Sequence, residues 1–405
     1  MLDFNSQEGT SLDFTSALYL GFTHESGRLP GWDRLTLGKP AALESPPGAR
    51  EVERELAALV GTERALLAPS TLHLFGDLLT VLAERDANFF VDDGAYPVAR
   101  WGAERVAAAG RLVLNFPRHD PRALSAAIAA AGRRMPVVVA DGFSPSGGML
   151  APIGEYLKCT AELNGLVVID DTQALGLLGP GPSHWAPFGR SGGGSLRHAR
   201  IRSRRVLLAS SLAKAFGAPL AMLAGSETLV TEFERKSATR VHCSPPSVAA
   251  IRAAERALAV NRRWGDALRF RLAQRVSRFR CGIRRLGLEG PAELFPVQVL
   301  RLPDAIDAML AHQALLDEGI RTVLHRANGD RARISFVLTA RHSPSEIDHA
   351  VACLLKVISR MMRRRKGAKS NGDSTQLTGE SAQSELGGVR GVRRTGSVHT
   401  APAEI

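Results

Sequence analysis

The chain has 405 residues, of which 44% are hydrophobic, so it can bury a sizeable core and is long enough for two domains. It contains no run of about 18 uncharged apolar residues, and acids interrupt residues 1–20, so neither a membrane-spanning helix nor a secretory signal is expected. The four cysteines are scattered without metal-ligand spacing. We therefore expect a cytoplasmic protein with reduced thiols and no metal site.

The net charge of +12 is concentrated in two stretches. Residues 190–205 hold six arginines and no acid, and residues 360–405 hold nine Lys or Arg against four acids. The rest of the chain is nearly neutral. A flexible, solvated loop and tail are the simplest interpretation, and weak contact with nucleic acid or another anionic surface is the alternative.

After an N-terminal arm (residues 1–45), short apolar runs alternate with helical patterns through residues 46–246. Strands are expected at 88–91, 111–116, 136–140, 165–170, 205–210 and 219–224. Helices are expected between them at 50–60, 71–84, 98–109, 121–131 and 154–163. This alternation predicts the α/β class, with a mainly parallel, doubly wound sheet in a large domain.

The pattern of predicted helices and strands changes near residue 247, which predicts a smaller C-terminal α/β domain over residues 247–362. A long Arg- and Ala-rich helix (247–286) opens it, and two further helices follow at 304–318 and 343–361. Its strands are expected at 296–302, 320–325 and 331–339. Residues 363–405 are rich in Gly, Ser, Thr and charge, which predicts a basic, disordered tail.

Polar side chains stand at the ends of two predicted strands, where open α/β sheets bind their ligands. Strand 165–170 ends in Asp170, and strand 205–210 is followed by Lys214, which lies among small and apolar residues. Partial desolvation there would lower the pKa of the Lys214 amine and make it a nucleophile that can form an imine. A helix-capping lysine and an N-cap aspartate are the alternatives.

The segments GLVVIDD, SSLAKAFG and PLAMLAGS resemble the cofactor site of fold-type I pyridoxal-phosphate (PLP) enzymes. The resemblance is strongest to the α-oxoamine synthases, a branch of aminotransferase class II that includes 8-amino-7-oxononanoate synthase, and it covers about residues 17–360. It implies PLP as the cofactor and Lys214 as the Schiff-base lysine. It further implies that Asp170 keeps the pyridine nitrogen protonated, so that the ring accepts electrons.

The same resemblance implies a cradle for the cofactor phosphate. Residues 63–92 match a family segment that places Ser70, Thr71 and Leu72 at the amino end of a helix, where free N–H groups and the helix dipole favour an anion. Ser211 matches a family hydroxyl that contacts the phosphate. An N-cap serine without a ligand is the alternative interpretation of Ser70.

Several positions depart from the family pattern. Tyr96 stands where the synthases carry a histidine that stacks on the ring, and an aromatic side chain still stacks there. Gln173 replaces a histidine near the cofactor O3′, so hydrogen bonding is kept without titration near neutral pH. Ala17 and Pro145 replace a family asparagine and serine. These changes bear on acyl transfer more than on cofactor binding.

In the small domain, the segment that contains Arg333 resembles one whose arginine holds the carboxylate of the amino-acid substrate, a task suited to a planar guanidinium. A surface strand arginine is the alternative. The segment 242–247 (HCSPPS) resembles a stretch that reaches the phosphate from a neighbouring subunit. The relatives build their site across a dimer interface, so we expect a homodimer.

The resemblance implies an α-oxoamine synthase-like acyltransferase. Its substrates would be an amino acid and an acyl thioester of coenzyme A or an acyl carrier protein, condensed with loss of carbon dioxide. The departures leave two alternatives open: a PLP-dependent aminotransferase, and a catalytically inactive PLP-fold binding protein.

Overall fold

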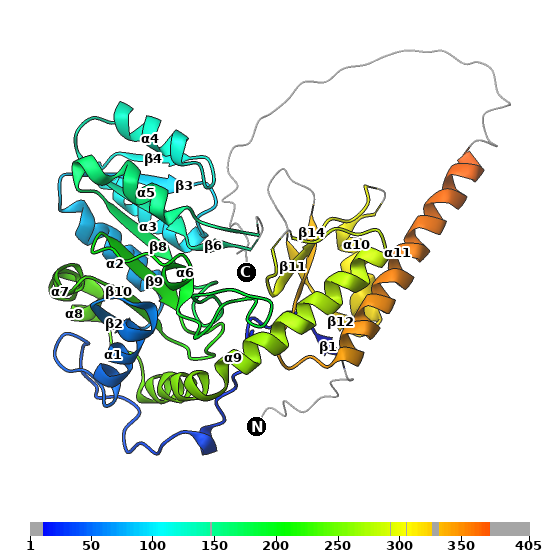
Figure 1. Cartoon of the computed structure of the whole chain (residues 1–405), viewed down its shortest axis with the longest axis horizontal. Helices are drawn as coiled ribbons and strands as arrows, with labels where there is room; N and C mark the ends of the chain where they lie inside the picture. The colour runs from blue at the N-terminus through cyan, green and yellow to red at the C-terminus, as the bar shows by residue number, and fades with distance from the viewer. Residues whose placement is uncertain (1–10, 146–147, 292, 305, 326–331, 373–405) are drawn as a thin grey trace, which may run out of the picture.

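The structure is a computed structural model that describes residues 11–145, 148–291, 293–304, 306–325 and 332–372. Figure 1 shows a large body built on one sheet and a smaller body beside it, with the long helix α9 reaching from the first to the second. The functional residues predicted from the sequence divide between these two bodies.

The large body contains a seven-stranded sheet in the order β2-β10-β9-β8-β5-β3-β4. Strand β10 pairs antiparallel with β2 and β9, and the other pairings of this sheet are parallel. The mainly parallel sheet that the sequence predicts is therefore confirmed. The strands are β2 (Arg64–Ala68), β3 (Ala87–Asp92), β4 (Val113–Phe116), β5 (Met135–Asp141), β8 (Leu166–Asp170), β9 (Val206–Ser211) and β10 (Ala221–Gly225).

Both faces of this sheet are covered because its strands are apolar on both sides. Along β8, Val167 and Ile169 pack on one face, and Leu166 and Val168 pack on the other. The first face carries α1 (Ala49–Val60), α4 (Pro121–Ala130), α5 (Ile153–Cys159) and the first half of α9, and the second carries α2 (Thr71–Ala83), α3 (Pro97–Ala108) and α7 (Glu227–Lys236). Each fully buried Val, Ile or Leu contributes about 1.5–3 kcal/mol, which fixes the register of the strands.

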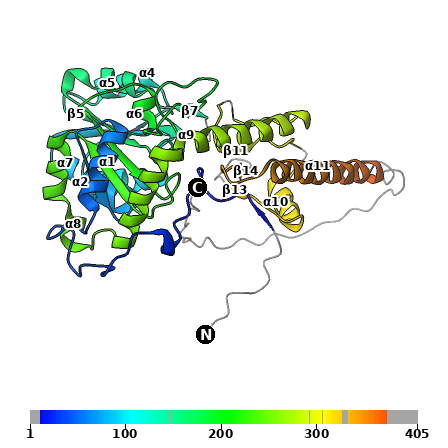
Figure 2. The same cartoon turned by 60° about the horizontal axis from the view of Figure 1, so that its bottom comes forward.

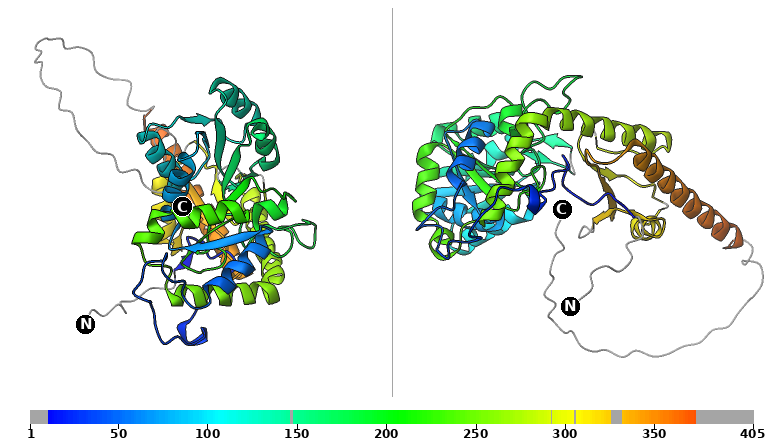
Figure 3. Two further views of the ribbon diagram at one scale, coloured as in Figure 1. Left: turned by 90° about the vertical axis from the view of Figure 1, so that its left-hand side faces the viewer. Right: turned by 90° about the horizontal axis from the view of Figure 1, so that it is seen from below.

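The small body is organised around α9 (Val248–Arg285) and α11 (Pro344–Gly372), which pack against each other. Figure 2 and the right panel of Figure 3 show α9 leaving the large body and running into the small one. A three-stranded sheet has the order β11-β14-β13, with bounds Val297–Leu300, Arg333–Val337 and Val323–His325. Helix α10 (Ala308–Asp317) contacts this sheet.

The N-terminal arm is tied to the small body before it reaches the large one. Strand β1 (Leu12–Asp13) pairs in parallel with β12 (Ile320–Arg321). Next along the chain, Phe14 stacks on His342 with ring centroids 4.4 Å apart. The arm therefore delivers residues 17–22 to the region between the two bodies.

Strand β2 and helix α11 are among the elements that differ from the sequence-based expectation, and the strand expected at 320–325 divides into β12 and β13 in separate sheets. Strand β2 was not expected, because its sequence RALLA has no β-branched residue, and pairing with β10 holds it in the sheet. Helix α11 continues past the boundary at residue 362 to Gly372, since Arg, Lys, Met and Ala all favour helix. The rest of the predicted tail, residues 373–405, lies outside the described residues.

Within the described ranges, neither of the two long helices nor any shorter one has an apolar stretch that would cross a membrane.

Candidate active site

The predicted site residues of the large domain meet at one edge of the central sheet. Asp170, the last residue of β8, pairs in register with Asp141 of β5 and with Ala209 of β9. Ser211 ends β9, and it faces Ala221 of β10, which in turn faces Ala68 at the end of β2. Because neighbouring strands lie about 4.8 Å apart, the ends of β2, β9, β8 and β5 form one continuous edge.

Lys214 and Asp170 form the charged centre of this edge. Asp170 is buried and accepts a hydrogen bond from the backbone N–H of Thr172 at 2.9 Å. Burial raises the pKa of Asp170, while Thr172 and Lys214 act in the opposite direction. Burial lowers the pKa of Lys214, and the nearby Asp170 and Asp141 carboxylates oppose that shift. The arrangement gives an amine of reduced basicity beside an anion.

An aromatic ring faces this amine. Tyr96 precedes α3 and its ring centroid is 5.9 Å from the Lys214 Nζ. The backbone N–H of Tyr96 donates to Oδ1 of Asp141 at 2.9 Å, so the end of β5 anchors the ring-bearing residue. The carboxylate, the amine and the aromatic ring therefore surround one space.

Gln173 lies in the turn that follows β8 and is held by the N-terminal arm. The hydroxyl of Tyr19, which is fully buried, donates to Oε1 of Gln173 at 2.6 Å. Tyr19 also packs edge-to-face on Phe295, and Phe295 stacks on Phe143 with centroids 4.1 Å apart. The arm and the small body thus reach the site through these aromatic contacts.

Hydroxyl groups and a helix N-terminus occupy the side of the edge nearest β2. Ser70 caps α2 and its Oγ accepts from the backbone N–H of His73, while Thr71 and Leu72 open the helix. The backbone N–H of Ser211 donates to Oγ1 of Thr172 at 3.0 Å, which links β9 to the turn after Asp170. Ser211 lies across β10 from Ala68 at the end of β2, and the predicted anion site at residues 70–72 follows directly after that strand.

Arg333 is the predicted site residue that lies apart from the others. It begins β14, in the three-stranded sheet of the small body, and its side chain is exposed. Its register partner is His325 on β13. Arg331, which begins the predicted arginine segment, lies outside the described residues.

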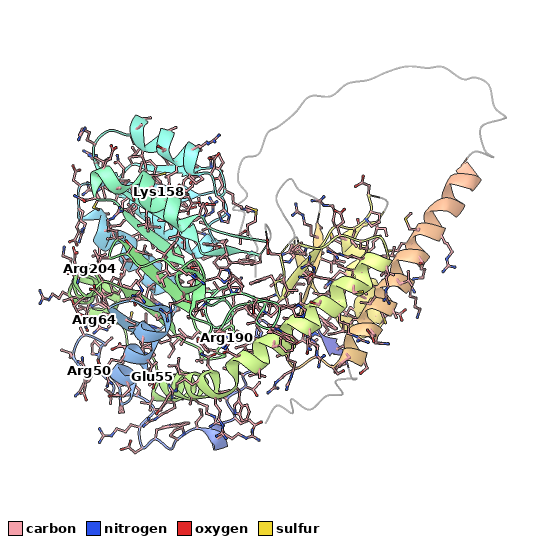
Figure 4. All side chains as sticks on the ribbon, in the orientation of Figure 1. Arg50, Glu55, Arg64, Lys158, Arg190 and Arg204 are labelled. Carbon is pink, nitrogen blue, oxygen red and sulfur yellow. The ribbon has the colours of Figure 1, made fainter. Side chains whose placement is uncertain are left out.

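The basic insert 190–205 is folded against the large body, in contrast to the flexible loop that its composition suggested. Buried Asp171 accepts from the backbone N–H of Ser195 at 3.1 Å, in the short helix α6 (Gly194–His198). Figure 4 labels Arg190 near α9 and Arg204 at the outer edge, where Arg204 bonds to Glu63. The glycines that suggested flexibility instead permit close packing.

Sequence reasoning missed two residues of this edge. Asp141 follows the predicted strand 136–140 directly, so its place at a strand end was a usable signal. Tyr19 lies 154 residues from Gln173, and no local pattern marks their hydrogen bond.

Comparison with known proteins places this arrangement in a family. Residues 34–354 match the family described as aminotransferase class I and II. The 8-amino-7-oxononanoate synthase of Thioalkalivibrio sulfidiphilus is 30% identical over 327 residues, which cover 77% of this chain and 76% of that protein.

Two solved structures share the fold. The serine palmitoyltransferase of S. paucimobilis with bound PLP-myriocin aldimine has a TM-score of 0.75 at 15% identity, covering 87% of this chain and 88% of that one. The 8-amino-7-oxononanoate synthase of Francisella tularensis has a TM-score of 0.67 at 19% identity, covering 87% and 98%. The family match over most of the chain, together with the 30% identical relative, shows that this chain belongs to the aminotransferase class I and II family.

Proposed function

We propose that this chain is a PLP-dependent transferase that condenses an amino acid with an acyl thioester and releases carbon dioxide. The observation that carries the proposal is the Lys214 amine of lowered pKa beside buried Asp170 at the carboxyl edge of the sheet. Family membership and the 8-amino-7-oxononanoate synthase relative support the same chemistry.

The donor set of the site fits PLP. Lys214 supplies a primary amine for the aldehyde, Asp170 an anion for the ring nitrogen, and Tyr96 an aromatic face. Ser211 and the free N–H groups at the start of α2 supply donors for a phosphate. When bound, PLP supplies an electron sink that stabilises negative charge at the substrate α-carbon.

Three side chains of the site have separate roles in the proposed reaction. Asp170 keeps a proton on the ring nitrogen, because a buried anion beside it strongly favours the protonated form. Lys214 at reduced pKa accepts the proton from the substrate α-carbon at its Nζ, as a general base must. Tyr96 covers one side of that space and excludes water from it.

Arg333 is proposed to hold the carboxylate of the amino-acid substrate. Because it lies on β14 of the small body, this role makes the small body part of the substrate site at the edge that carries Lys214. The aromatic bridge from Phe295 to Phe143 already joins the two. The Gln173 amide remains next to the site as a neutral hydrogen-bonding group.

The cofactor assignment is tested by absorbance and by borohydride reduction. Wild type supplied with PLP should show a Schiff-base band, and reduction should label Lys214. Lys214→Ala should lose both the band and turnover, whereas Lys158→Ala, which changes an exposed lysine of α5, should keep them. Labelling of a different lysine would disprove the assignment.

Transamination is the second candidate, favoured by Tyr96 and Gln173 where the synthases carry histidines. An aminotransferase would convert fully to the pyridoxamine form when it is given an amino donor alone. The synthase proposal instead expects carbon dioxide release that depends on an acyl-CoA. Full conversion without consumption of any acyl-CoA tested would replace the proposed reaction and leave the cofactor assignment in place.

A further inference from the structure

Three aspartates end three neighbouring strands of the central sheet. Asp92 ends β3, Asp141 ends β5 and Asp170 ends β8, and these strands are adjacent in the order β8-β5-β3. The three side chains are buried, with exposed fractions of 1%, 9% and 6%. Asp141 is in register with Asp170, whereas Asp92 lies one position out of register with Asp141 and is bonded by Tyr156 on the other face of the sheet.

The hydrogen bonds to these three carboxyl groups are unequal. Asp92 accepts from the N–H groups of Gly94 and His119 and from the hydroxyl of Tyr156, at 2.6, 2.9 and 2.9 Å. These donors satisfy the Asp92 carboxyl group within its own surroundings. Its charge contributes less to the pKa of Asp141 than the charge of Asp170 does.

On the other side, Asp170 accepts from the Thr172 N–H and interacts with Lys214. Asp141 accepts a hydrogen bond from the Tyr96 N–H. The charged groups that act on Asp141 are Asp170 from β8, Asp92 from β3 and Lys214 from the turn after β9.

We infer that Asp141 remains protonated and acts as a positioning residue that anchors Tyr96, while Asp170 alone carries the negative charge beside Lys214. Two adjacent buried carboxylates that share one cation cannot both ionise without strong repulsion. Asp141 keeps the proton, because both the backbone and the side chain of Thr172 stabilise the Asp170 anion, whereas Asp141 has the Tyr96 N–H. In support, burial and the Asp170 charge raise the pKa of Asp141 well above its usual value.

A protonated Asp141 has a consequence for the nucleophile. A second anion beside Lys214 would stabilise its ammonium form and raise its pKa. Burial lowers the pKa of Lys214 even against both carboxylates, and a neutral Asp141 removes one of these two opposing charges, so the amine is less basic than beside two anions. One carboxyl group thereby holds the stacking residue in place without reducing the reactivity of the lysine.

The first test uses the apoprotein and does not depend on the proposed function. Since the folded pKa of Asp141 is raised, the unfolded chain binds fewer protons between the ordinary and the raised value, and stability falls as pH rises through that window. Asp141→Asn should remove this part of the decline. We expect its urea midpoint to exceed that of wild type above about pH 7 and to converge with it near pH 4.

The second test uses PLP itself and rests on the proposed function. Asparagine keeps a carbonyl that accepts the Tyr96 N–H, so Asp141→Asn should retain PLP affinity and the wild-type absorbance titration. Asp141→Ala should weaken PLP binding on the order of tenfold, because the Tyr96 N–H loses its partner. Asp170→Asn, the matched change on the paired strand, should weaken it at least as much.

Asp141→Asn that weakens PLP as strongly as Asp170→Asn, or an apoprotein variant with the pH dependence of wild type, would overturn the inference. If wild type does not bind PLP, the proposed function fails, and the apoprotein comparison still decides the protonation of Asp141.

Discussion

Tyr19 fixes the orientation of the Gln173 amide. Burial raises the pKa of the Tyr19 hydroxyl, so it stays protonated and donates to Oε1. Tyr19→Phe removes this donor at nearly constant volume and leaves a buried amide oxygen unpaired, which costs about 1–3 kcal/mol. We expect a lower free energy of unfolding in urea and a shifted pH titration of the PLP absorbance.

Tyr156→Phe is the matched control, because it removes a hydroxyl that donates to Asp92. It should lower the free energy of unfolding and leave the absorbance titration in place. A Tyr19→Phe variant whose absorbance titrates like wild type would show that Tyr19 is only structural.

Asp171 is a second buried carboxyl group that makes the stability of the fold depend on pH. It is fully buried, and burial raises its pKa to about 7. The unfolded chain loses this proton near pH 4, so stability falls as pH rises from about 4 to 7, by on the order of 4 kcal/mol at most. Asp171→Asn should remove that slope in urea unfolding measured across this range, and parallel curves for both proteins would contradict the assignment.

At the scale of elements, the basic insert depends on glycine where α6 begins. Gly194 has φ of +84°, and a Cβ there would lie 1.9 Å from Oδ2 of Asp171. Gly194→Ala therefore combines backbone strain with a steric clash against the Asp171 carboxylate. We expect the free energy of unfolding, measured in urea, to fall by about 2–4 kcal/mol.

Gly181→Ala separates these two effects. Gly181 lies in the same connection with φ of +66°, and a Cβ there would meet no atom within 4 Å. Gly181→Ala should lower the free energy of unfolding by about 1 kcal/mol, from backbone strain alone. Equal losses at the two positions would show that the contact with Asp171 contributes nothing.

At the scale of the whole molecule, exposed apolar side chains support the proposed homodimer. Leu43 of the N-terminal arm is 74% exposed, and the neighbouring residues Ala41 and Ala42 bond to the backbone of Cys243 and Arg240. Segment 242–247 is the one proposed to reach a second subunit. Light scattering should give twice 43.4 kDa for wild type.

A glutamate in place of Leu43 should shift the protein toward monomer, because a charge would have to be buried in the interface. Leu310→Glu is the control: this leucine is 64% exposed on α10, in the small body. A wild-type mass of one chain in the presence of PLP would disprove the dimer.

The sequence by itself determined the elements that local patterns encode. Continuous apolar runs that end in a polar residue predicted β8 and β9, and with them Asp170 at a strand end and Lys214 just after one. Helical patterns of apolar residues predicted the large-domain helices, because helix formation depends on residues only a few positions apart. These features required no knowledge of distant partners.

Tertiary structure alone decided the pairings between distant residues. It recruited the Ala- and Leu-rich segment of β2 into the sheet, placed Asp141 beside Asp170, and brought Tyr19 to Gln173. It also ordered the basic insert, whose glycines accept positive φ and close contacts. Such contacts depend on strand register and on the burial of both partners, and neither property is contained in the short sequence window around any one residue.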